Sequence, residues 1–291
     1  MVDLNISETI ENTALELIRS AVTKLPIDVK DAIQKAYRQE DSKIGRMVLK
    51  TIIDNIKLAE KLERPLCQDT GLIVFYAKVG DRFGSITRVS NALRSAVKRA
   101  TVEVPIRPNA VHPISRRNTG DNTGLGIPPI NWSFTIGDSL ELTVLPKGAG
   151  AENKSVLMMC KPSEGVNTIK KFVIDTVIQA GGQPCPPTIL GVGIGGTAEL
   201  AMSLAKKALL RPINQPNKED EMAELEKALF NAINKTGIGP MGLGGRVSTI
   251  GVNIEYAYCH TSSLPVGINF QCWCARRASA RIYRDGEVVM E

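Results

Sequence analysis

Three of the six cysteines in this 291-residue chain stand far apart, in segments rich in glycine, proline and small polar residues. They are Cys67 in residues 65–71, Cys185 in residues 181–187 and Cys272 close to Trp273. This layout predicts thiolates that the fold brings together, and three thiolates can hold three irons of a [4Fe-4S] cluster. The fourth iron would be an open Lewis acid that binds a hydroxyl and a carboxylate and assists loss or addition of water.

Other uses of these cysteines remain open from the residues alone. A zinc site or a ferredoxin cluster normally contains a close Cys-x-x-Cys pair, which this sequence lacks. The plain alternative is that each cysteine is a small buried hydrophobic residue. Cys160, in an apolar run, fits that alternative, whereas the neighbours of Cys67 and Cys185 favour loops. Composition leaves Cys259 and Cys274 undecided.

A glycine-rich motif, residues 191–196, matches the G-x-G-x-x-G dinucleotide fingerprint and lies between a predicted strand and a predicted helix. The acidic residues that follow, Glu219 and Asp220, fall in a polar loop, whereas the fingerprint needs an acid at a strand end. Close approach of the backbone to a cluster or an anion explains the glycines equally well. A dinucleotide-binding module is therefore the alternative from another class. A regulatory or interaction protein with structural cysteines is a third.

Further residues suit an anionic substrate. The glycine-rich stretch 147–153 has the composition of an anion-binding loop, although a flexible connector fits as well. Arg107 precedes a rigid proline and could bind a carboxylate in a bidentate manner, or be an ordinary surface arginine. The chain has two histidines, His112 and His260, which are too few for a metal site built from histidines. His260 is a candidate proton donor, against the alternative of a structural role.

Charge and composition narrow the classes of partner. The chain has 36 Lys and Arg against 30 Asp and Glu, which gives a net charge of +6, and 4% aromatic residues. Basic residues are scattered and aromatics scarce, so we expect no nucleic-acid partner. A mildly basic enzyme that draws in carboxylates or phosphates fits better.

The sequence also predicts a cytoplasmic protein. No apolar run approaches the roughly 18 residues that span a bilayer. Residues 1–5 lack the basic and apolar regions of a signal peptide. Cytoplasmic cysteines stay reduced, so we expect no disulfide framework. Because no apolar run is long enough to span a bilayer, we also expect no membrane partner.

Hydrophobic periodicity predicts the elements that must position these residues. Residues 7–62 are predicted to form three helices, the first ending at Pro26. Beyond them we predict helices over 89–102, 166–180, 197–209 and 221–233, strands over 72–77, 188–192, 252–258, 266–270 and 278–283, and a hairpin of 132–136 with 140–145. The expected fold class is α/β, in which a helical N-terminal layer (1–62) precedes mixed sheets flanked by helices (63–291). We expect one catalytic domain over residues 1–291.

Five ordered motifs, taken together, are more specific than any one alone. They are Cys-Gln-Asp-Thr-Gly at 67–71, Arg-Pro-Asn at 107–109, Lys-Gly-Ala-Gly-Ala-Glu-Asn at 147–153, Cys-Pro-Pro at 185–187 and the stretch from His260 to Trp273. Over about residues 60–280 the chain resembles the class I, iron–sulfur-dependent fumarate hydratases. Its length is similar to the α subunit of their two-subunit form, whose near relative is the α subunit of L(+)-tartrate dehydratase.

The resemblance implies a role for each of eight residues. Cys67, Cys185 and Cys272 would hold the [4Fe-4S] cluster; Gln68, Asp69, Arg107 and the backbone of Gly150 would contact substrate; Asp69 and His260 would be catalytic, with His260 beside the substrate hydroxyl. Cys272 is preferred to Cys274 because it precedes Trp273, as in relatives.

The reaction that the resemblance implies is the reversible hydration of fumarate to L-malate, and dehydration of L(+)-tartrate is the alternative. In single-chain members this region is followed by a second catalytic domain. Because this chain ends at Glu291, we expect a separate β subunit to complete the active site with further cationic side chains and the base.

Overall fold

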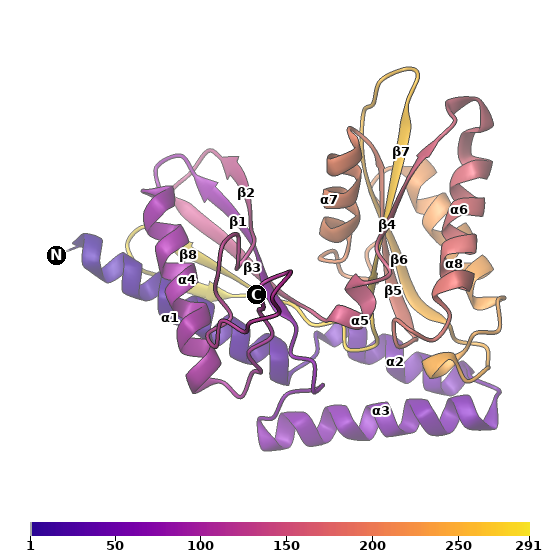
Figure 1. Ribbon diagram of the computed structural model, residues 1–291, viewed down its shortest axis with the longest axis horizontal. Coiled ribbons are helices and arrows are strands. Elements are labelled where there is room, and N and C mark those ends of the chain that lie inside the picture. The colour runs from indigo at the N-terminus through magenta and orange to yellow at the C-terminus, as the bar shows by residue number, and fades with distance from the viewer. Residues whose placement is uncertain (1) are drawn as a thin grey trace. The chain divides into compact units, whose positions relative to one another are not determined.

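The computed structural model describes the backbone of residues 2–291 and the side chains from residue 6 onward. The chain divides into two compact units. Figure 1 shows the ribbon coloured by residue number. The first consists of Met1–Pro26, Ile56–Gly148 and Arg276–Glu291, and the second of Ile27–Asn55 and Ala149–Ala275. The three predicted N-terminal helices are present, but they are shared between the units, so the division expected at residue 62 differs from the one observed. A single catalytic domain stays a prediction.

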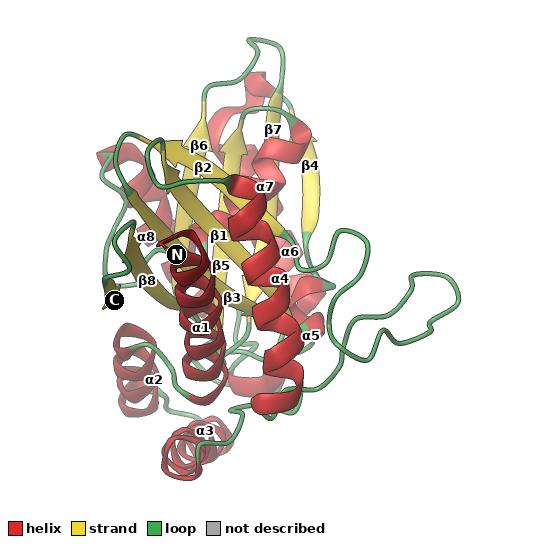
Figure 2. Ribbon diagram, turned by 90° about the vertical axis from the view of Figure 1, so that its left-hand side faces the viewer, coloured by secondary structure: helices red, strands yellow, loops and turns green. Residues whose placement is uncertain are grey.

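The first unit is a five-stranded mixed sheet with two helices on it. Its strands lie in the order β2-β1-β3-β8-β9, with β2 parallel to β1 and the other pairs antiparallel. The elements are α1 (Val2–Thr23), β1 (Leu72–Gly80), α4 (Ile86–Glu103), β2 (Ile130–Thr135), β3 (Ser139–Lys147), β8 (Ala278–Tyr283) and β9 (Val288–Met290). In Figure 2 both α1 and α4 lie in front of this sheet.

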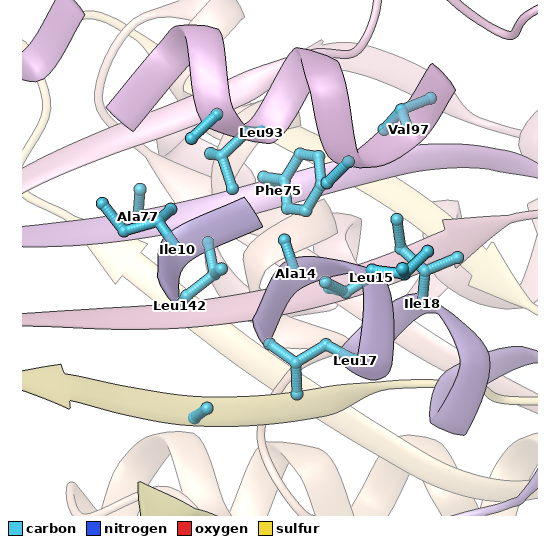
Figure 3. Close-up of a cluster of buried hydrophobic side chains, with 14 of the residues drawn as sticks. Ile10, Ala14, Leu15, Leu17, Ile18, Phe75, Ala77, Leu93, Val97 and Leu142 are labelled. Carbon is cyan, nitrogen blue, oxygen red and sulfur yellow. The ribbon is translucent and has the colours of Figure 1, made fainter. Parts of the chain in front are cut away.

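The core of the first unit forms where these two helices meet the sheet (Figure 3). Ile10, Leu17 and Ile18 recur at helical spacing on α1 and are fully buried. They pack in one cluster with Phe75 of β1 and Leu93 of α4. Each such side chain contributes about 1.5–3 kcal/mol by leaving water. This core therefore anchors β1 against the two helices.

The predicted hairpin of residues 132–136 and 140–145 is wrong in its pairing. Both strands exist, but β1 lies between them and pairs with each. The connection crosses the end of β1, where the N–H of Gly137 donates to Asp81 Oδ1 at 2.8 Å. Arg82 N–H in turn donates to the Gly137 carbonyl at 2.9 Å. A short turn between two strands thus did not make them neighbours.

The second unit is a four-stranded mixed sheet covered on both faces. Its order is β4-β7-β5-β6, with β5 parallel to β6 and β7 antiparallel to β4 and β5. Helix α7 lies on one face, and α6 and α8 on the other (Figure 1). The elements are α2 (Ile27–Gln39), α3 (Lys43–Leu62, which continues into the first unit), α5 (Ala149–Glu152), β4 (Val156–Cys160), η1 (Pro162–Glu164), α6 (Gly165–Ala180), β5 (Thr188–Gly195), α7 (Ala198–Ala208), α8 (Asp220–Asn234), η2 (Pro240–Gly242), β6 (Thr249–Ala257) and β7 (Leu264–Gln271).

The α/β fold class is confirmed by these two mixed sheets and their helices. Among the helices of residues 2–291, none is both long and apolar enough to cross a membrane.

Candidate active site

In the first unit, the loop between α3 and β1 presents Cys67 and its neighbours. The loop begins where Leu66 N–H donates to the carbonyl of Val22 at 2.9 Å. Asp69 Oδ1 accepts the N–H of Gly71 at 2.9 Å, a local turn that fixes the carboxylate. Cys67 is half-buried and Gln68 is exposed. The loop is thus anchored at both ends, with Gln68 exposed and Asp69 half-buried.

Arg107 is held beside this loop through its backbone. Its N–H donates to Thr70 Oγ1 at 3.0 Å, and its carbonyl accepts from Asn122 Nδ2 at 3.0 Å. Asn109 Nδ2 donates to the carbonyl of Gly71 at 3.3 Å. The Arg107 side chain itself is exposed. Within this unit the structure therefore brings Arg107 to the loop that carries Cys67, Gln68 and Asp69.

The buried guanidinium of Arg276 lies near the same carboxylate. A Cβ added at Gly148 would lie 3.1 Å from Asp69 Oδ2 and 3.7 Å from Arg276 Nη2. Arg276 is 2% exposed and Lys147 is 4% exposed. Sequence reasoning did not single out Arg276, because an Arg-Arg pair is normally a surface feature. Positive charge beside Asp69 suits an anionic substrate.

In the second unit, Cys185 and Cys272 lie at one edge of the sheet. Since β5 and β7 are antiparallel, the start of β5 and the end of β7 meet at this edge. Trp273 N–H donates to the carbonyl of Cys185 at 3.2 Å, which joins the two segments. Both cysteines are half-buried, and Cys185 has a φ of 56°, a backbone conformation uncommon for a residue with a Cβ. Strained backbone of this kind is often found at functional sites.

The remaining cysteines are placed differently. Cys160 is buried in the core, as predicted, and burial raises the pKa of its thiol. Cys274 is fully buried and Cys259 is exposed in the loop after β6. A cluster that is open to substrate needs ligands near the surface, so the half-buried Cys272 fits better than Cys274.

Gly150 lies on the short helix α5, beside the Cys185 loop. A Cβ added at Gly150 would lie 3.4 Å from the carbonyl of Gln183. Glu152 fixes α5, because it forms an ion pair with Lys206 and accepts from Asn269 Nδ2 at 3.2 Å. The stretch 147–153 therefore consists of the end of β3, Gly148 and the helical turn of α5, and it contains the boundary between the two units.

His260 does not lie at this edge of the second unit. It belongs to the loop that joins β6 to β7 at the upper end of that sheet in Figure 1, while β7 ends at the lower end. The eight residues of β7 separate the two ends by about 25 Å. His260 Nδ1 accepts the N–H of Ser262 at 3.1 Å, and its side chain is exposed. Within one chain, His260 is not brought to Cys185 and Cys272, and its catalytic role stays a prediction.

The predicted ligands come from both units: Cys67 belongs to the first, and Cys185 and Cys272 to the second. In the part of the chain that the structure describes, no three His, Cys, Asp or Glu side chains are grouped closely enough to hold a single metal ion. The donor set nevertheless has the right chemistry, since half-buried thiols are the usual ligands of iron–sulfur clusters. The three-cysteine set stays a prediction.

Comparison with known proteins decides the family. The model of the family described as "Fumarate hydratase (Fumerase)" matches residues 11–281. The chain belongs to this family.

Several of its relatives within the fumarate hydratase family are named as dehydratase subunits. A protein of Methanocaldococcus jannaschii named "Putative L(+)-tartrate dehydratase subunit alpha" is 49% identical over 283 residues, which cover 96% of this chain and 99% of that protein. The "L(+)-tartrate dehydratase subunit alpha" of Escherichia coli strain UTI89 is 39% identical over 264 residues, which cover 90% of this chain and 87% of that protein. The same name and identity describe a protein of Shigella boydii. Family members with these names are hydro-lyases, and so is this chain.

In this hydro-lyase the glycine-rich motif 191–196 serves packing within the fold. Gly191 and Gly193 lie inside β5, not in a turn after it. A Cβ added at Gly191 would lie 2.0 Å from the carbonyl oxygen of Ala205, and one at Gly193 would lie 2.0 Å from that of Ala201. Both acceptors belong to α7, so the glycines let strand and helix backbones touch. Dinucleotide fingerprints instead place their glycines in the turn that faces the phosphates, and the dinucleotide interpretation is therefore not supported.

Gly193→Ala is expected to destabilise the protein by about 1–3 kcal/mol or more, because the strand and α7 must separate. Chemical denaturation measures this as a lower midpoint. Gly124→Ala is the matched control, since its added carbon meets Thr119 Cγ2 at an ordinary 3.7 Å. Equal midpoints for the two variants would contradict the packing role.

Proposed function

We propose that this chain is the α subunit of an iron–sulfur hydro-lyase that hydrates fumarate reversibly to L-malate. Cys67, Cys185 and Cys272 would hold a [4Fe-4S] cluster. The observation that carries the proposal is the pair of half-buried cysteines, Cys185 and Cys272, joined by the hydrogen bond from Trp273 N–H to the Cys185 carbonyl.

The residues of the chain have distinct tasks in this proposal. Bound there, the cluster would supply a Lewis acid that polarises the carbon–oxygen bond of the hydroxy acid. The exposed guanidinium of Arg107 can take a carboxylate in a bidentate manner, and the amide of Gln68 can donate to it. Asp69, whose Oδ1 accepts the N–H of Gly71, would take part in proton transfer. The backbone N–H at Gly150 offers a further donor to an anionic oxygen.

A separate β subunit forms part of the proposal. The relatives that match this chain over most of their length are named as alpha subunits. We infer that a partner supplies further cationic groups and the catalytic base. The α chain alone would then bind the cluster but catalyse poorly.

Dehydration of L(+)-tartrate is the second candidate, because the printed names of the matched relatives specify that substrate. L-Malate and L(+)-tartrate are both four-carbon dicarboxylates with a hydroxyl at the carbon where the bond breaks. Selectivity between them would depend on a few polar contacts. A site built to hydrogen-bond the second hydroxyl of tartrate would bind malate poorly, because its polar group would be left unpaired.

The test is anaerobic reconstitution of the chain with iron and sulfide, followed by addition of its β subunit. We expect broad visible absorption, activity on L-malate that exceeds activity on L-tartrate, and loss of activity in air. Faster turnover of L-tartrate would favour the second candidate. An active enzyme that binds no iron, or that survives in air, would contradict the iron–sulfur proposal.

A further inference from the structure

A glycine-rich segment of the second unit, residues 237–245, has no role in the proposed reaction. It connects α8 to β6 and contains η2. Its glycines at 237, 239, 242, 244 and 245 all have positive φ, and so does Met241 at 54°. Hydrogen bonds within the segment join the N–H groups of Gly242, Leu243 and Gly244 to the carbonyls of Gly239, Pro240 and Ile238, and the segment as a whole is fixed in place by contacts on two sides.

One side of this segment packs against the Cys185 loop. The N–H of Met241 donates to the carbonyl of Pro186 at 2.8 Å. A Cβ added at Gly242 would lie 2.5 Å from the Cα of Gly182. The two backbones are therefore in direct contact on both sides of Cys185, with no side chain between them.

The other side of the segment rests on Glu40, at the junction of α2 and α3. Glu40 Oε1 accepts the N–H of Arg246 at 2.9 Å, and Oε2 accepts that of Val247 at 2.8 Å. Oε1 also accepts the N–H groups of Asp41 at 3.1 Å and Ser42 at 2.9 Å. A Cβ added at Gly245 would lie 2.7 Å from Glu40 Oε1, so this glycine lets the loop close onto the carboxylate.

The carboxylate is built to remain charged in this position. Glu40 is 2% exposed, and burial disfavours its ionised form. The four backbone N–H donors outweigh that cost and hold the pKa of Glu40 below its ordinary value. A charged group with four backbone donors makes strong hydrogen bonds and leaves little freedom to the chain that supplies them.

We propose that Glu40 is a positioning residue for Cys185: it clamps residues 245–247, and through them it holds residues 239–242 against residues 182–186. The inference rests on the proposed function only in giving Cys185 the role of a cluster ligand. Glu40 itself belongs to the second unit, as do all the segments that it connects to Cys185.

The test measures the Cys185 thiol directly, in the full-length chain without iron. Glu40→Gln places an amide NH₂ where a carboxylate oxygen accepted N–H groups, which breaks part of the clamp. We expect iodoacetamide to alkylate Cys185 roughly tenfold faster than in the wild type, with Cys67 of the first unit unchanged, as followed by mass spectrometry. After reconstitution, the same variant should lose its cluster faster to a chelator.

Two control variants separate positioning from general stability. Asp41→Asn removes the same charge from the next, exposed residue and should leave Cys185 unchanged. Asp28→Asn removes a buried acid whose Oδ2 accepts the N–H of Ile213 at 3.0 Å, and it should lower stability without a selective effect on Cys185. Equal acceleration at Cys185 in the Asp28 and Glu40 variants would overturn the proposal.

A second variant keeps the test valid if Glu40→Gln does not fold. Gly242→Ala acts at the Cys185 end of the same connection and should also accelerate alkylation of Cys185. Unchanged alkylation in this variant would overturn the proposal. If the wild-type chain binds no iron but the variants still show selectively faster alkylation of Cys185, the positioning role is supported and the iron–sulfur function is refuted. The two failures can therefore be told apart.

Discussion

Replacing Cys185 or Cys272 by serine is expected to abolish iron–sulfur absorption and the hydro-lyase activity of the complex. Serine keeps the size of the side chain but offers a hard, protonated oxygen in place of a soft thiolate. Loss of a ligand should cost far more than the roughly 10- to 100-fold that follows loss of an outer partner. The same result is expected for Cys67→Ser. Anaerobic absorption spectra, iron content and turnover of L-malate measure these effects.

The other cysteines provide the controls for that experiment. Cys259→Ser changes an exposed thiol in the loop after β6 and should leave absorption and activity unchanged. Cys274→Ala changes a fully buried residue, so stability should fall while the cluster is retained. An intact cluster in Cys272→Ser together with its loss in Cys274→Ala would transfer the ligand role to Cys274.

Most elements of the fold could be predicted because their signals are local. The helix expected over 89–102 is α4 (Ile86–Glu103), and the strand expected over 188–192 is the start of β5. Periodic apolar positions and short β-branched runs report which face of an element is buried, whatever it packs against. The burial of Cys160 followed from the same kind of pattern.

Strand pairing and the use of glycines could not be predicted in this way. The turn at Gly137 indicated a hairpin, but β1, more than fifty residues earlier in the chain, takes the place between the two strands. Likewise the spacing of Gly191 and Gly193 is the same whether they face a phosphate or a helix. The contact with α7 that decides between these uses is a tertiary one.

The candidate site, like the fold, could be predicted only where its signals are local in the sequence. Motifs local in sequence placed Cys67, Gln68 and Asp69 on one loop, and the structure adds Arg107 through Thr70. The buried charges of Arg276 and Glu40 gave no signal, because a charged residue is expected at the surface unless distant partners compensate it. His260 lies close to Cys272 in sequence, but β7 separates the two residues within the second unit, and the catalytic role of His260 stays a prediction.

Asp69→Asn is expected to lower kcat/KM for L-malate by about 10²–10⁴, the usual range for loss of a group that transfers a proton. The asparagine carbonyl can still accept the N–H of Gly71, so the loop and the bound cluster should be preserved. Asp81→Asn is the matched control, because Asp81 also accepts a backbone N–H, at the other end of β1. Loss of the cluster in Asp69→Asn would instead assign this residue to cluster retention.

Gly148→Ala tests whether the position of the Asp69 carboxylate matters as well as its charge. The added carbon would lie 3.1 Å from Asp69 Oδ2, so the carboxylate must move by a few tenths of an ångström. Small displacements of a catalytic group lower the rate steeply, and we expect about a tenfold loss in kcat with an unchanged cluster spectrum. Full activity in Gly148→Ala combined with a large loss in Asp69→Asn would mean that Asp69 acts through its charge alone. Loss of activity in both variants would show that residue 148 must lack a side chain so that the Asp69 carboxylate can occupy its position.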